Sequence, residues 1–172
     1  MQTTAIADAG APERGVSNTA KRKRKRRGLD AFVGNWTMEG EQYGKVFSLP
    51  ARVSAEESFE WLPGRKFLIH RVTGQLGGSD LVSIEVIDAD PTPGGYRVHT
   101  FYGDGRAQDW LLVENDDNWT ISADWSLADG SIRGMRCTVR FESDETRSAK
   151  WEVSNYGTWK TFWVITSEKK HR

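Results

Sequence analysis

KFLIHRV (Lys66–Val72), LVSIEVID (Leu81–Asp88) and GYRVHTFY (Gly95–Tyr102) are three consecutive segments that decide the fold. Each is rich in β-branched and aromatic residues and alternates with a period of two, as strands do. The linkers TGQLGGSD (Thr73–Asp80) and ADPTPG (Ala89–Gly94) carry the glycine, proline and aspartate that favour turns. The sequence therefore predicts two successive antiparallel hairpins in this region.

The same period continues on both sides of these hairpins. Further strands are expected at Gly34–Gly40, Ala51–Trp61, Arg106–Glu114, Asn118–Trp125, Met135–Glu142, Arg147–Ser154 and Trp159–Ser167. Only Leu29–Val33 suggests a short helical turn. Sequential hairpins favour an up-and-down meander, and closure into a barrel removes exposed sheet edges. We therefore predict an all-β fold, an antiparallel up-and-down β-barrel of about 8–10 strands.

The first 28 residues differ from the rest of the chain. KRKRKRR (Lys21–Arg27) is an unbroken basic run that repels itself and cannot be buried. Residues 1–28 hold eight basic and two acidic side chains, whereas residues 29–172 hold 16 basic and 22 acidic ones, so the overall neutrality hides two opposite charges. We expect residues 1–28 to form a disordered basic tail and residues 29–172 to form the barrel.

Several features bear on location and partners. No apolar run is long enough for a membrane helix or resembles the core of a secretion signal, and Cys137 is the single cysteine. These features predict a cytoplasmic protein with no membrane partner. The Lys21–Arg27 run could bind nucleic acid through its phosphates, although a solvated, non-specific tail is the simpler interpretation. A homodimer is also an open alternative.

The two hairpins place three chemically active side chains in one row. A loop centred between residues 77 and 78 puts His70 opposite Glu85, and a loop centred on residue 92 puts Glu85 opposite His99. A turn centred on Asp104 extends the row to Asp109. Directly opposed residues share one face of a sheet. The sequence therefore predicts a polar row of two imidazoles and two carboxylates.

The meaning of this row depends on which face of the wall points inward. If the row faces the lumen, Glu85 can orient a histidine and raise its pKa, as acid–base catalysis requires. The opposite face is more apolar, however, so simple patterning places the row in water. Arg71 then becomes a buried cation, near Thr100 and Gln108, that could hold a ligand carboxylate. The alternative without a ligand is that Arg71 reaches solvent at the barrel mouth or pairs with an acidic neighbour.

Metal and nucleophile chemistry find little support. His70 and His99 are two strands apart, roughly 9–10 Å, which is too far for one tightly bound ion. No serine or cysteine nucleophile motif is present, and Cys137 alternates with Met135 and Val139 as a core residue does. We therefore expect no metal and no cofactor.

Residues 29–170 resemble the calycin group, which includes lipocalins, fatty-acid-binding proteins and haem-binding nitrobindins. The resemblance is greatest to a bacterial lipocalin-like family of unknown function. It rests on five stretches: LDAFVGNWTMEG (29–40), in which Gly34-x-Trp36 opens the first strand as in calycins, FEWLPGRKFLIHRVTG (59–74), SIEVIDADP (83–91), YRVHTFYGDG (96–105) and the Trp-rich last strand WKTFWVITS (159–167). It implies that Trp36 closes one barrel end beneath Lys169 or Lys170, and that the barrel has a cavity. A nitrobindin-type haem would need a histidine in the last strand, which WKTFWVITS lacks.

Two functions follow as hypotheses. The first is binding of a small hydrophobic or amphipathic molecule in the lumen of a cytoplasmic barrel. The ligand-binding candidates are Arg71, Trp61, Thr100, Gln108, Asp109 and Trp110. The second is a small cyclase- or isomerase-type enzyme in which His70, Glu85 and His99 perform acid–base chemistry. A third interpretation makes the barrel structural and the basic tail the functional part.

Overall fold

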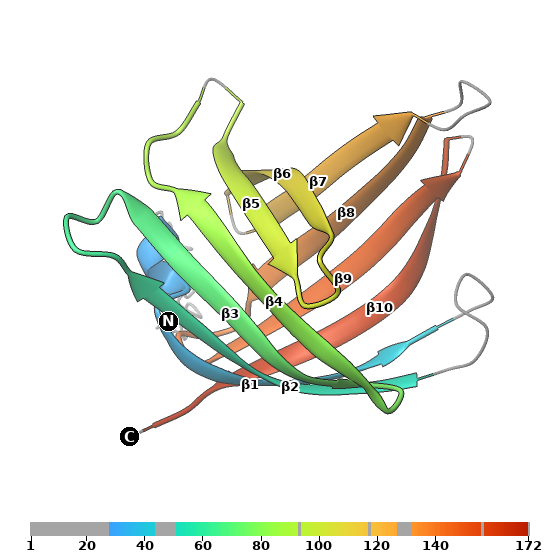
Figure 1. The fold of residues 1–172 in the computed structure, drawn as a ribbon, viewed down its shortest axis with the longest axis horizontal. Helices are drawn as coiled ribbons and strands as arrows, with labels where there is room; N and C mark the ends of the chain where they lie inside the picture. The colour runs from blue at the N-terminus through green and yellow to red at the C-terminus, as the bar shows by residue number, and fades with distance from the viewer. Residues whose placement is uncertain are drawn as a thin grey trace, which may run out of the picture.

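The computed structural model of the chain describes residues 28–43, 51–92, 94–116, 118–126, 132–155 and 157–171. These residues form a closed barrel of ten antiparallel strands (Figure 1). The strands are β1 (Gly34–Gln42), β2 (Ala51–Trp61), β3 (Phe67–Leu76), β4 (Ser79–Asp88), β5 (Tyr96–Tyr102), β6 (Ala107–Asn115), β7 (Asn118–Ser126), β8 (Ile132–Phe141), β9 (Thr146–Asn155) and β10 (Thr158–Lys169). Each strand pairs with its neighbour in sequence, and β1 pairs with β10 to close the wall. The expected all-β, antiparallel up-and-down barrel is therefore confirmed.

The basic run Lys21–Arg27 lies outside the described residues, so the expected tail stays a prediction. The helical turn expected near residue 29 is present as the 3-10 helix η1 (Leu29–Ala31). In the described part of the chain, no helix has the length and apolar character needed to cross a bilayer.

Aromatic side chains close the barrel end next to η1. Phe32 follows η1 and packs edge-on against Trp119 and Phe141, with ring centroids 5.2 and 5.1 Å apart. Trp36 on β1 is fully buried, and its indole N–H donates a hydrogen bond to the Phe32 carbonyl at 2.8 Å. The Lys169 ammonium lies 5.2 Å from the Trp36 ring centroid. This is the basic side chain expected over Trp36.

The register of the hairpins decides which side chains face inward. His70 pairs with Glu85 between β3 and β4, and His99 pairs with Asp109 between β5 and β6, both as expected. Between β4 and β5, however, Glu85 pairs with Thr100 and not with His99. A slip of one residue moves a side chain to the other face of a sheet. The predicted four-residue row is therefore wrong, because His70 and Glu85 face the lumen while His99 and Asp109 face solvent.

Candidate ligand-binding site in the barrel lumen

The lumen contains a cavity of about 360 Å³, next to the aromatic side chains that close the η1 end of the barrel. Phe32 and Phe59 lie at its closed end, and Gln42, Tyr102 and Arg106 line it near the opposite end of the strands. The Arg106 side chain is largely exposed, so the cavity meets solvent there. Aliphatic and aromatic side chains supply most of the wall, including those of Met38, Val72, Leu81, Ile87, Val98, Trp110, Ile121, Trp151 and Ile165.

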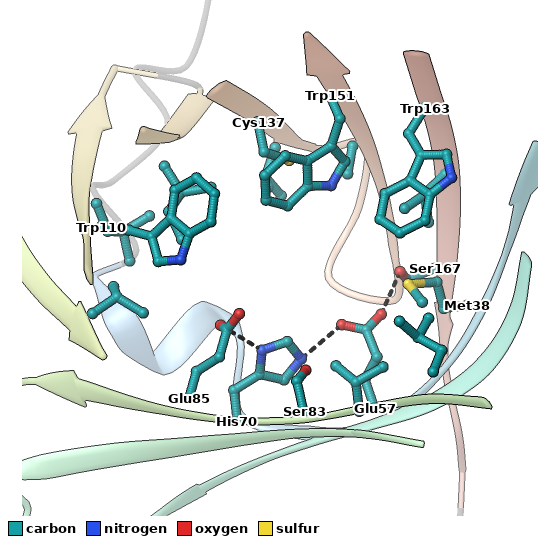
Figure 2. Close-up of a pocket in the computed structure, with 18 of the residues that line it drawn as sticks. Met38, Glu57, His70, Ser83, Glu85, Trp110, Cys137, Trp151, Trp163 and Ser167 are labelled. Carbon is teal, nitrogen blue, oxygen red and sulfur yellow. Dashed lines mark hydrogen bonds and ion pairs between the residues drawn. The ribbon is translucent and has the colours of Figure 1, made fainter. Parts of the chain in front are cut away.

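A row of polar side chains crosses one wall of this cavity (Figure 2). His70 occupies its centre and donates from Nδ1 to Glu85 Oε2 at 2.8 Å and from Nε2 to Glu57 Oε2 at 3.0 Å. Ser167 on β10 donates its hydroxyl to Glu57 Oε1 at 2.8 Å. Four strands, β2, β3, β4 and β10, thus contribute to one continuous hydrogen-bonded row.

Arg147 on β9 anchors this row at the closed end of the barrel. Its Nη2 donates to Glu57 Oε2 at 2.6 Å. The guanidinium carbon lies 4.6 Å from the Trp36 ring centroid and 4.9 Å from that of Phe59, within cation–π range. Phe59 in turn stacks on the His70 imidazole, with centroids 3.9 Å apart and planes 8° apart. The aromatic residues at the closed end, here called the aromatic plug, therefore pack directly against the polar row; they are Phe32, Trp36, Phe59, Trp119 and Phe141.

The electrostatics of the row favour charged forms despite burial. Burial alone would lower the pKa of His70, but the Glu85 and Glu57 carboxylates raise that pKa to about 9. Burial likewise opposes ionisation of Glu57, but Arg147 and His70 lower the pKa of Glu57 to about 2. At neutral pH His70 is therefore an imidazolium that donates both ring protons, and Glu57 is a carboxylate.

Three tryptophans face this row from the opposite wall (Figure 2). Trp110 and Trp151 meet edge to face with centroids 5.7 Å apart, and Trp151 and Trp163 do so at 6.3 Å. Cys137 lies beside them and is buried, and burial raises the pKa of its thiol. Indole rings supply large, rigid apolar surfaces. The lumen thus has one polar wall and one aromatic wall.

The structure brings only part of the predicted site residues together. His70, Glu85 and Trp110 line the cavity. Thr100 faces inward and is buried, and its hydroxyl has no hydrogen-bond partner among the described residues, but it does not line the cavity.

The other candidates lie elsewhere. Arg71 is exposed and approaches Glu60 at 4.0 Å, so it is not the buried cation that the apolar-face alternative required. His99 and Asp109 form an exposed pair at 2.7 Å. Gln108 donates its amide to the Asp109 carbonyl, and the Trp61 indole donates to Asp30, outside the cavity lining. Arg71, His99 and Asp109 lie on the outward face of their strands. Trp61 and Gln108 share the inward register of their partners Leu68 and Thr100, but they lie near the strand ends and do not line the cavity.

Sequence reasoning missed Glu57, Arg147 and Ser167. Glu57 alternates with Val53, Ala55 and Phe59 on the buried face of β2. An acidic residue within an apolar inward-facing row is unusual unless it is paired. The position of Glu57 within this apolar row is therefore the sequence signal that could have identified it as a site residue.

The polar row is not arranged as a metal centre. Glu57 and Glu85 bind opposite nitrogens of His70, so their carboxylates lie on opposite edges of the ring. Across the described ranges, no three or more His, Cys, Asp or Glu side chains converge in a way that could hold a metal ion.

The fold and the lumen define the class of this protein as a closed up-and-down β-barrel with an internal pocket. Rv2717c from M. tuberculosis is similar in structure, with a TM-score of 0.59 and 13% sequence identity over 83% of this chain and 95% of that one. The S-type phycobiliprotein lyase CPES from Guillardia theta is similar with a TM-score of 0.56 and 8% identity, over 83% and 90% of the two chains. At these identities the likeness concerns the fold. No protein-family model and no curated protein matches the sequence.

Proposed function

We propose that this barrel binds a small, largely apolar molecule in its lumen. The observation that carries the proposal is the lumenal cavity of about 360 Å³, which is walled mainly by apolar side chains and crossed by one hydrogen-bonded polar row. Its volume lies within the roughly 300–1,000 Å³ that is typical of small-molecule sites. Such sites combine an apolar wall with a few polar groups that orient the ligand.

The same proposal places the chain among calycin-like barrels. It is supported by the ten-stranded closed meander, by Gly34-x-Trp36 at the start of β1, and by the Lys169 ammonium over the buried Trp36 ring. In such a barrel the inward-facing side chains of all ten strands surround one lumen, which can enclose a ligand.

A second candidate function is acid–base catalysis on the bound molecule, of the cyclase or isomerase type. It is favoured by the Glu85 carboxylate, which projects into the cavity and accepts a hydrogen bond from His70 (Figure 2). His70 already donates both ring protons, so Glu85 is the group that would accept a proton from a substrate, with His70 as a positioning residue. His99 has no part in this chemistry because it lies on the outer face.

Calorimetric titration of the full chain with 9-anthracenemethanol tests lumenal binding. Ala149 on β9 lines the cavity, whereas Ala107 on β6 is exposed outside. We expect Ala149→Phe to weaken binding by roughly tenfold or more, since forcing extra volume into a filled site costs about 1–3 kcal/mol. Ala107→Phe, the matched control, should bind as wild type does. Equal affinities for all three proteins would rule out lumenal binding.

The second candidate needs a different readout. Native mass spectrometry of the full chain, purified from its own host, should reveal the mass of a retained molecule. Incubating that molecule with the protein distinguishes the two functions: unchanged ligand indicates binding, whereas conversion that Glu85→Gln abolishes indicates catalysis.

A further inference from the structure

The polar row leaves one charged atom free for a ligand. Both oxygens of Glu57 accept hydrogen bonds within the row, and both nitrogens of His70 donate them. Glu85 uses Oε2 for His70, and its Oε1 has no hydrogen-bond partner among the described residues. Glu85 lines the cavity, so this oxygen is an acceptor available to the lumen. The row therefore offers a bound molecule a negative acceptor.

The cationic side chains that line the cavity, in contrast, already have carboxylate partners. The Arg147 side chain is only 5% exposed, because it bonds Glu57 and packs against the aromatic plug. Arg106 at the open end pairs with Asp104 at 2.8 Å and lies over the Tyr102 ring. His70 is shared between two carboxylates. An anionic ligand would thus find every cation of the described lining already paired.

The aromatic wall favours the same kind of ligand. Trp110, Trp151 and Trp163 line the side of the cavity opposite Glu85 (Figure 2). An indole face carries negative charge density that attracts a cation, and its flat surface suits another flat ring. A protonated nitrogen that reaches Glu85 would therefore have a carboxylate on one side and aromatic rings on the other. A carboxylate would lose its hydration and meet Glu85.

We propose that the lumen selects a flat, apolar molecule that carries a protonated amine nitrogen, with Glu85 Oε1 accepting its N–H hydrogen bond. This inference rests on the proposed function and names the chemical class of the ligand. It differs from the carboxylate ligand that the sequence suggested for Arg71, because Arg71 lies outside the lumen.

Three probes of one size test the inference by calorimetry on the full chain: 9-(aminomethyl)anthracene, 9-anthracenemethanol and anthracene-9-carboxylate. Wild type should bind the amine most tightly and the carboxylate least. Glu85→Gln keeps an acceptor for His70 but removes the charge, so it should weaken amine binding by roughly tenfold or more, as loss of a charge-assisted hydrogen bond does. It should weaken binding of the alcohol much less than binding of the amine, because the alcohol carries no charge. Asp109→Asn neutralises the exposed carboxylate partner of His99 and is the matched control, with wild-type affinity for all three probes.

The outcomes separate the two proposals. If the alcohol and the carboxylate bind in the lumen as tightly as the amine, or Glu85→Gln leaves amine affinity unchanged, the amine inference is overturned and lumenal binding stands. If no probe binds wild type, the proposed function fails and the inference fails with it. The ranking of the three probes on wild type does not depend on whether a variant folds, so it decides the inference even if Glu85→Gln is unstable.

Discussion

Arg147 on β9 and Glu57 on β2 form a hydrogen-bonded ion pair at 2.6 Å inside the barrel, although β1 and β10 separate their strands in the wall. The pair therefore links parts of the sheet that share no backbone hydrogen bonds. It also joins the aromatic plug to the lumenal row, because Arg147 packs on Trp36 and Glu57 bonds His70. The closed end and the ligand site form one interlocked unit.

Breaking this pair should destabilise the fold strongly. Arg147→Met leaves the Glu57 carboxylate buried without its main counter-ion, which typically costs about 3–5 kcal/mol. Urea unfolding followed by circular dichroism measures the change in the free energy of unfolding. Because Glu57→Gln removes the stranded charge, adding it to Arg147→Met should restore part of the loss.

The matched control is the exposed pair of Lys66 and Asp90, whose charged atoms are 3.1 Å apart. Lys66→Met should cost no more than about 1 kcal/mol, as is usual for solvent-exposed ion pairs. Equal losses for Lys66→Met and Arg147→Met would contradict the anchoring role of Arg147.

The stability of the protein should depend on pH through His70. The carboxylates around His70 raise its pKa from 6.5 to about 9, so the folded state holds a proton that the unfolded state releases. This stabilisation is complete below pH 6.5 and is lost as the pH rises through about 9. The difference in unfolding free energy between wild type and His70→Gln should therefore shrink over this interval, by on the order of 2–3 kcal/mol.

His99 provides a surface control for the replacement of His70. It also contacts a carboxylate, Asp109 at 2.7 Å, but the pair is exposed and solvent screens it. His99→Gln should lower the free energy of unfolding by no more than about 1 kcal/mol. A His70→Gln profile parallel to that of wild type would show that the lumenal imidazole is not held in its charged form.

Cys137 should be almost inert in the folded protein. It is buried in the lumen wall, and burial raises the pKa of its thiol, so little of the reactive thiolate forms. We expect 5,5′-dithiobis(2-nitrobenzoate) to react with one thiol per chain in denaturant and with almost none in native buffer. Rapid stoichiometric reaction of the native protein would mean that the lumen opens far more widely than the structure indicates.

The strands and part of the register could be predicted from the sequence. All ten strands lie within a few residues of the expected segments, because alternating patterns and turn residues are local signals. The pairing of His70 with Glu85 followed from a nearly symmetric loop. Between β4 and β5 the pairing differs by one residue from the symmetric one, and no local signal in the loop, which contains a bridge between Thr92 and Gly95, marked this difference. His99 was therefore placed on the wrong face.

The inward face of β3 and β4 could not be read from hydrophobicity. Val82, Ile84 and Phe101 are exposed on the outside, whereas His70 and Glu85 face the lumen. Hydrophobic patterning assumes that the interior is apolar. A lumen with a paired polar row violates that assumption. Glu57 lies on the neighbouring strand β2, but Arg147, which pairs with Glu57, lies 90 residues further along the chain.

A crystal structure of the full chain with 9-(aminomethyl)anthracene is the most direct test of the central claim. We predict that the ring lies in the lumen against Trp110 and Trp151, with its nitrogen within hydrogen-bonding distance of Glu85 Oε1. An empty lumen with the ring bound instead on the exposed surface at Ile84 and Phe101 would contradict the claim.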